Sequence, residues 1–197
     1  MSGIMNGMVL HGGIKPYGAT FLVFTDYARN AVRLSALMGL SNIFVYTHDS
    51  VALGEDGPTH QPIEHMVTLR ATPNLNNWRP ADLVEAAVAW KEAITSKETP
   101  TCLIFSRQST SPISRTPKKI SMISMGGYLL EENDNPDITI IASGSEVQLA
   151  LDAAKDLKND SVLANVVSMP SLDIFLQQSK EFQNDVIKQD KPILVVE

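Results

Sequence analysis

The chain alternates short apolar runs with longer segments that carry apolar residues at helical spacing. Runs of strand length, rich in β-branched and aromatic residues, lie at residues 20–24, 42–46 and 100–106. Helical spacing marks residues 27–39, a short segment at 63–70, and a helix opening at Arg79-Pro80-Ala81-Asp82, with Pro80 expected in its first turn. This alternation predicts an α/β fold: a parallel sheet with helices on both faces.

A second α/β domain is predicted towards the carboxyl end. Strands are expected at residues 138–142, 162–168 and 192–196, with helices at 146–157 and 172–187. Ser145 and Gln148 have the spacing of a capping box for the first of these helices. Residues 109–125 are rich in Ser, Thr and Pro and predict a linker between a domain at 1–108 and one at 126–197.

Both ends of the chain have the pattern of an interrupted domain. Residues 5–10 predict the last turns of a helix, which the His11-Gly12-Gly13 turn would end. The last residue, Glu197, directly follows a predicted strand that has no covering helix after it. We therefore expect both domains to be truncated.

Composition narrows the class of protein. The 197 residues are 44% hydrophobic and 19% charged, which is typical of a globular chain and not of a disordered one. A net charge of −6 disfavours nucleic-acid and anionic membrane partners. A single cysteine, Cys102, gives no disulfide framework and predicts a reducing, cytoplasmic setting. No apolar run approaches the ~18 residues of a membrane span, and residues 1–10 lack a secretory pattern.

Polar side chains follow each of the first three predicted strands. They are Thr25-Asp26-Tyr27, Thr47-His48-Asp49 and Ser106-Arg107-Gln108. Ligands of parallel α/β sheets bind beyond the carboxyl ends of the strands. The sequence therefore predicts a site at this edge of the sheet.

The loop at residues 47–62, THDSVALGEDGPTHQP, concentrates titratable groups directly after a buried strand. His48, Asp56 and His60 are within reach of one another, and Gly57-Pro58 restricts the backbone paths. By composition alone the loop could equally be a solvated connector with satisfied histidines. Zinc is disfavoured here, because ligands on both sides of Gly-Pro have no fixed spacing.

This loop resembles the signature of the transketolases. The resemblance continues through LHGGIKPYGATFLVFTDYARNAVRLSALMG, LRATPNLNNWRPADLVEAAVAWK and LIFSRQ, and then through GGYLL, IASGSEVQLA and VVSMPS. It implies an enzyme of the pentose phosphate pathway that depends on thiamine diphosphate. Such an enzyme reversibly transfers a two-carbon ketol unit from a ketose phosphate, such as xylulose 5-phosphate, to an aldose phosphate, such as ribose 5-phosphate.

The resemblance also implies roles for particular residues. Phe21, Phe24 and Tyr27, whose spacing alone fits a core stripe, match aromatic residues that stack on the aminopyrimidine ring of the cofactor. His48 and Arg107 match residues that hold the substrate phosphate. Asp56 matches a residue that binds a donor-sugar hydroxyl. His60 matches one that bonds the reacting oxygen and moves protons.

Other parts of the family's site have no counterpart in the chain. The family's catalytic glutamate precedes the matched segment, and no Gly-Asp-Gly motif occurs to bind the diphosphate and its Mg²⁺ or Ca²⁺. We therefore expect a fragment with no metal ligands of its own, inactive alone, from an enzyme that is a homodimer with the cofactor at the subunit interface. The alternatives are a dihydroxyacetone or deoxyxylulose-phosphate synthase, and a non-catalytic dimerising module.

Overall fold

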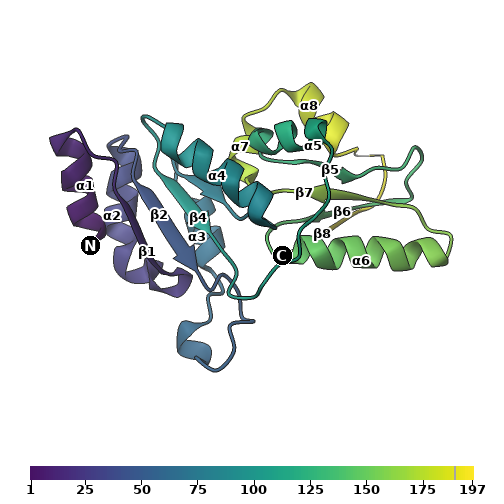
Figure 1. Ribbon diagram of the computed structural model, residues 1–197, viewed down its shortest axis with the longest axis horizontal. Coiled ribbons are helices and arrows are strands. Elements are labelled where there is room, and N and C mark those ends of the chain that lie inside the picture. Colours follow the sequence, from purple (N-terminus) through teal and green to yellow (C-terminus); the bar gives the residue numbers. More distant parts are fainter. Residues whose placement is uncertain (189) are drawn as a thin grey trace. The chain divides into compact units, whose positions relative to one another are not determined.

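The computed structural model describes residues 1–188 and 190–197. The chain divides into two compact units: Met1–Trp78 with Ala89–Ser109, and Arg79–Val88 with Thr110–Glu197 (Figure 1). Each unit contains one four-stranded sheet and its own helices, and each is described by itself.

The sheet of the first unit is entirely parallel, as predicted. Its strands run in the order β1-β2-β4-β3, with bounds β1 Tyr17–Phe21, β2 Ile43–Thr47, β4 Thr101–Ile104 and β3 Asn76–Trp78. The two central strands, β2 and β4, are buried almost throughout, which is why they read as continuous apolar runs.

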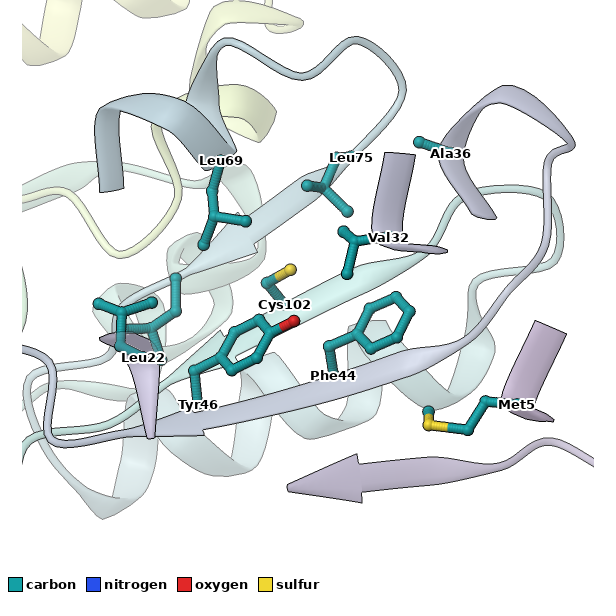
Figure 2. Packing of buried hydrophobic residues seen from close by; sticks show 10 residues of the cluster. Met5, Leu22, Val32, Ala36, Phe44, Tyr46, Leu69, Leu75 and Cys102 are labelled. Atoms are coloured by element: carbon teal, nitrogen blue, oxygen red, sulfur yellow. The ribbon is translucent and has the colours of Figure 1, made fainter. Parts of the chain in front are cut away.

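Helices of the first unit pack on this sheet and form its core. They are α1 (Ser2–His11), α2 (Thr25–Leu37), α3 (His65–Arg70) and the later part of α4 (Leu83–Thr95), with the single-turn helix η1 (Leu22–Phe24). A second single turn, η2 (Pro58–His60), has no buried residue and lies outside this core. Figure 2 shows Phe44 and Tyr46 from β2 beside Cys102 from β4, with Val32 and Leu69 of the covering helices packed against them. The positive φ of Gly12, 87°, ends α1 as the sequence predicts.

Two strands of the first unit differ from the prediction. The first strand was expected at residues 20–24 but lies three positions earlier. It ends at Phe21, and Leu22–Phe24 form a 3₁₀ turn. The turn buries Leu22 completely, which explains why the apolar run of the sequence continues beyond the end of the strand. The three residues of β3, Asn76–Trp78, lie at the edge of the sheet and carry no strand pattern.

The start of α4 also differs. Pro80 precedes the helix instead of lying in its first turn, because the helix begins at Leu83. Asp82 caps it: the backbone N–H of Glu85 donates to Oδ1 of Asp82 over 3.1 Å. Oε2 of Glu85 in turn accepts a bond from the backbone N–H of Ala81 at 2.7 Å.

The sheet of the second unit is mixed. Its order is β5-β7-β6-β8, with bounds β5 Tyr128–Glu131, β7 Ala164–Ser168, β6 Ile138–Ala142 and β8 Ile193–Val196. Strand β5 was not predicted and pairs antiparallel with β7, whereas β6 is parallel to both of its neighbours. The helices are α5 (Pro117–Met122), η3 (Ile123–Met125), α6 (Glu146–Asn159), α7 (Leu172–Leu176) and α8 (Lys180–Val186). The first two lie in the expected linker, residues 109–125.

Two local predictions in the second unit are wrong. Ser145 precedes α6 but makes no capping bond, because its φ and ψ of −62° and −24° are helical and its hydroxyl donates to Glu146 instead. The single helix expected at residues 172–187 is divided into α7 and α8. Ser179 starts the second helix by accepting a bond from the backbone N–H of Phe182.

The second unit contains a buried group of charged and hydroxyl side chains. The guanidinium of Arg115 contacts Oδ2 of Asp82 at 2.5 Å and Oε1 of Glu85 at 3.1 Å. Hydroxyls of Tyr128 and Ser168 donate to the same Glu85 oxygen, each over 2.7 Å. These partners of the Glu85 side chain are all donors, so its buried oxygens are satisfied.

Candidate functional site

The site predicted from the sequence lies at the carboxyl edge of the first sheet. Strands β1, β2 and β4 end at the same level, because Phe21 is opposite Thr47 and Tyr46 is opposite Ile104. Phe21 ends β1, His48 directly follows β2, and Arg107 lies three residues after β4. Polar side chains therefore follow the ends of β2 and β4 at one edge of the sheet, as predicted. For β1 the prediction is wrong, because the turn Leu22–Phe24 separates the strand end from Thr25-Asp26-Tyr27.

Four of the predicted side chains form a cluster of aromatic rings. The ring of Phe21 stacks on the imidazole of His48, with centroids 3.7 Å apart and planes inclined by 25°. The imidazole of His60 lies edge-on to Phe24 at 5.3 Å and to Phe21 at 6.1 Å. We refer to Phe21, Phe24, His48 and His60 as the ring cluster. Tyr27 extends it, 5.9 Å from Phe24 and 88% exposed.

The backbone at His48 is in an unusual conformation. Its φ of 59° lies in the left-handed region, which residues other than glycine adopt rarely. The turn directs the imidazole back over Phe21, and Nδ1 lies 3.0 Å from the hydroxyl oxygen of Thr47. A left-handed residue directly after a buried strand therefore fixes the position of this ring.

The position of His60 follows from the residues before it. Gly57 has a φ of 75°, and Pro58 then begins the single turn η2, which ends at His60. The side chain of Gln61 donates to the carbonyl of Val51 over 3.0 Å, which joins the two ends of the loop. Nδ1 of His60 lies 2.9 Å from the Thr59 hydroxyl. His48 and His60 are both half-buried.

A cavity of about 350 Å³ adjoins the ring cluster in the first unit. Phe24 and Tyr27 form part of its wall, and the remaining lining comes from α1, β1, α2 and β2. Small residues leave the space open, namely Gly18, Ala19, Ala28 and Ala31. Its volume is within the range of small-molecule pockets.

The cavity has aromatic residues in its wall, which is the kind of lining that the aminopyrimidine ring implied by the resemblance would require. Aromatic walls suit a flat heterocycle, because stacking adds dispersion and offset-ring contacts. Tyr46 also lines the cavity, and its hydroxyl is buried and has no hydrogen-bond partner among the described residues. Burial raises the pKa of Tyr46, so this hydroxyl stays neutral and able to donate.

Two predicted residues remain apart from the ring cluster. Asp56 and Arg107 are both exposed, and neither makes a hydrogen bond or ion pair with the described part of the chain. Asp56 lies on the loop between β2 and η2, and Arg107 follows β4. Within the described structure, no side-chain contact therefore fixes either of them.

The cavity was not predicted from the sequence. Its walls include residues at the start of α1, where the sequence indicates only a helix. Tyr46 belongs to an apolar strand run, and nothing in that run separates a cavity-lining tyrosine from an ordinary core residue. The small residues at positions 18, 19, 28 and 31 were the one available signal.

Over the described residues, no helix has the length and apolar character needed to cross a bilayer.

Comparisons with known proteins agree for both parts of the chain. Residues 1–112 match the family model of the transketolase pyrimidine-binding domain, and residues 126–197 match that of the transketolase-like C-terminal domain. The chain is 55% identical over 191 residues to transketolase 1 of Vibrio parahaemolyticus, covering 96% of this chain and 29% of that protein. Transketolase 1 of Pasteurella multocida is 53% identical over 191 residues, with coverages of 95% and 29%.

Solved structures give the same result. A transketolase of Pichia stipitis in complex with sedoheptulose 7-phosphate superposes with a TM-score of 0.96 at 48% identity, covering 100% of this chain and 29% of that one. A split-gene transketolase, described as an inactive β4 tetramer, has a TM-score of 0.69 at 30% identity, covering 86% and 53%. The chain thus spans about 29% of the length of the curated relatives it matches. It belongs to the transketolase family.

Proposed function

We propose that the chain supplies the pyrimidine-binding and sugar-phosphate-binding part of a thiamine-diphosphate-dependent transketolase. The observation that carries this proposal is the ring cluster at the carboxyl edge of the first sheet, beside a cavity walled by Phe24 and Tyr27. The reaction is the reversible transfer of a two-carbon ketol unit from a ketose phosphate to an aldose phosphate. Its pathway is the pentose phosphate pathway.

The aromatic residues would hold the cofactor by its pyrimidine ring. Phe21, Phe24 and Tyr27 offer ring faces and edges next to the cavity. Bound thiamine diphosphate supplies the carbanion chemistry that breaks and forms the carbon–carbon bonds. The protein residues orient the ring and exclude water from it.

The polar residues would bind and protonate the sugar phosphate. The net charge of −6 gives no general attraction for anions, so the phosphate depends on local donors. His48 and Arg107 supply them, with Arg107 able to donate to two phosphate oxygens at once. Asp56 accepts a bond from a donor-sugar hydroxyl, and His60 exchanges a proton with the reacting oxygen.

The diphosphate and its Mg²⁺ or Ca²⁺ require other segments. No Gly-Asp-Gly motif occurs in the sequence, and the chain spans 29% of its relatives. We infer that these ligands come from a separate domain, in a homodimer whose cofactor lies at the subunit interface. The chain alone is then expected to be inactive. The inactive β4 tetramer of the split-gene relative gives a parallel for such a state.

A chimeric enzyme tests this function. The 191 matched residues of the Vibrio parahaemolyticus transketolase 1 are replaced by the corresponding residues of this chain. The chimera is expected to transfer ketol units from xylulose 5-phosphate to ribose 5-phosphate. The variant His60→Asn should lower kcat about 10²–10⁴-fold, which is the usual contribution of a general acid or base.

A matched histidine variant controls for the substitution itself. His11, at the exposed end of α1, lies outside the ring cluster, and His11→Asn should leave kcat unchanged. A well-folded chimera that binds thiamine diphosphate and magnesium but transfers no ketol unit would contradict the proposal. So would an active chimera whose kcat does not change when the His60→Asn substitution is introduced.

A further inference from the structure

A second group of potential ligand residues lies in the first unit, outside the ring cluster. Asp26 is in the first turn of α2, Glu64 precedes α3, and His65 is the first residue of α3. One ligand atom from each lies within 4.8 Å of the other two. We refer to Asp26, Glu64 and His65 as the acidic-histidine cluster.

The imidazole of His65 is the unusual member of the cluster. His65 is only 4% exposed, and neither of its ring nitrogens makes a hydrogen bond with the residues that the structure describes. A buried imidazole normally uses both nitrogens, because each loses its water on burial. Here Nε2 lies 3.4 Å from Oδ1 of Asp26, and Nδ1 lies 4.0 Å from Oε2 of Glu64. Both contacts are with carboxylates, so these two neighbours of the ring are themselves potential metal ligands.

The two carboxylates open the cluster towards solvent. The side chains of Asp26 and Glu64 are 63% and 70% exposed. Among the described residues, neither makes an ion pair with an arginine or a lysine. Arg29, one turn further along α2, is not paired with Asp26. Within the described part of the chain, the cluster thus places two negative charges and one buried imidazole together without a compensating basic side chain.

We propose that the acidic-histidine cluster binds a divalent transition-metal ion, with Zn²⁺ the best match. Zinc accepts imidazole nitrogen and carboxylate oxygen at about 2.0–2.2 Å, so two of its ligand atoms lie about 3.4 Å apart in a tetrahedron. The Asp26–His65 pair already has that separation, and rotation of the exposed Glu64 side chain brings in the third ligand. Three protein ligands leave the fourth position to water.

The donor set favours zinc over magnesium and calcium. Those ions prefer oxygen ligands only, six or more of them, and a magnesium ion keeps most of its water. One buried imidazole with two carboxylates suits Zn²⁺ or Co²⁺ better. The metal joins the beginning of α2 to the beginning of α3, two helices that are 39 positions apart at these residues. A bound ion therefore stabilises this part of the first unit.

Titration of the chain with Co²⁺ tests the site. The chain is first dialysed against a chelator and then titrated with CoCl₂, followed by visible absorption, which is strong only for low-coordinate cobalt. We expect one equivalent to bind and ZnCl₂ to displace it. Zinc should also raise the midpoint of thermal unfolding, because it binds the folded state.

Variants identify the ligands. His65→Gln removes the imidazole and Asp26→Asn removes one charge, and each should weaken Zn²⁺ binding by about tenfold or more. Asp26 is exposed, so its variant tests the site even if His65→Gln destabilises the fold. His11→Gln and Asp134→Asn are the matched controls, since both residues are exposed and lie outside the cluster.

Three outcomes would overturn the proposal. The first is the absence of cobalt absorption and of any zinc-dependent change in unfolding temperature. The second is metal binding that survives both Asp26→Asn and His65→Gln. The third is binding lost in His60→Gln but kept in His65→Gln, which would place the metal at the ring cluster.

Discussion

At the scale of single residues, the predicted site residues are of two kinds: those whose position is fixed by the backbone and those that are exposed without a partner among the described residues. His48 and His60 are held by the backbone, His48 through a φ of 59° and His60 through the turn that Gly57 and Pro58 begin. Asp56 and Arg107 are exposed and have no protein partner in the described structure. The first pair is thus pre-organised, whereas no contact with the described residues fixes the side chains of the second pair.

Replacement of His48 should weaken substrate binding more than turnover. Asparagine tolerates a positive φ, so His48→Asn removes the imidazole without adding backbone strain. A hydrogen bond to a charged phosphate is worth about 1.5–3 kcal/mol, so KM for xylulose 5-phosphate should rise roughly ten- to a hundredfold. Steady-state kinetics of the chimera measure this. A variant that lowers kcat and leaves KM unchanged would contradict a phosphate-binding role.

The carboxyl of Asp82 should make the second unit sensitive to acid. Burial disfavours its charge, but hydrogen bonds from Arg115 and from the N–H groups of Ile113 and Glu85 outweigh that cost and hold the pKa of Asp82 below its ordinary value. Stability from a lowered pKa is present above the unfolded value, about 3.9, and is lost as the pH falls through the folded one.

Urea unfolding of the parent chain and of Asp82→Asn from pH 7 to pH 2 measures this contribution. The difference in unfolding free energy between them should be constant above about pH 5 and should shrink below it. The exposed Asp134→Asn serves as the control for charge removal. A difference that grows as the pH falls would contradict the assigned direction of the shift.

At the scale of elements, the sequence predicts buried elements well and edge elements poorly. Strands β2, β4 and β6 are largely apolar, since all three are interior strands of their sheets, and β2 and β4 are buried almost throughout. The edge strand β3, Asn76-Asn77-Trp78, forms because β4 offers it a free row of backbone groups. This pairing depends on backbone groups and not on side chains, so the periodicity of the sequence could not predict β3.

Helix starts were predicted less well than helix interiors. Proline is common in the first turn of helices, yet Pro80 precedes α4. Asp82 accepts a hydrogen bond from the N–H of Glu85, and the helix begins at Leu83. Ser145 has the spacing of a capping box, yet its helical backbone angles direct its hydroxyl elsewhere. In both cases tertiary contacts choose among local options of similar energy, which sequence spacing cannot resolve.

Two glycines with the same φ separate backbone strain from packing. Gly126 and Gly12 both have a φ of 87°, so alanine costs about 1–2 kcal/mol at either position. A Cβ at Gly126 would also collide with backbone atoms of Phe175 and Ser171, whereas one at Gly12 would meet open space. Overpacking adds about 1–3 kcal/mol. Thermal unfolding should therefore show Gly126→Ala to be the more destabilising variant, and equal losses would contradict the packing argument.

At the scale of the whole molecule, the chain matches two consecutive domains of the transketolases. The resemblance in the sequence predicted the family and the α/β class, and the comparisons confirm both. The roles of Phe21, Phe24, Tyr27, His48, Asp56, His60 and Arg107 stay predictions. The cavity could not be predicted, because residues from several elements enclose it and only the fold brings them together.

The most direct test of this account is ketol transfer by the isolated 197-residue chain. Purified chain is supplied with thiamine diphosphate, Mg²⁺, xylulose 5-phosphate and ribose 5-phosphate, and formation of sedoheptulose 7-phosphate is followed over time. Because the chain has no Gly-Asp-Gly motif to hold the diphosphate and its metal, we predict no product above the protein-free control. Turnover that increases in proportion to the amount of pure chain would contradict the central claim.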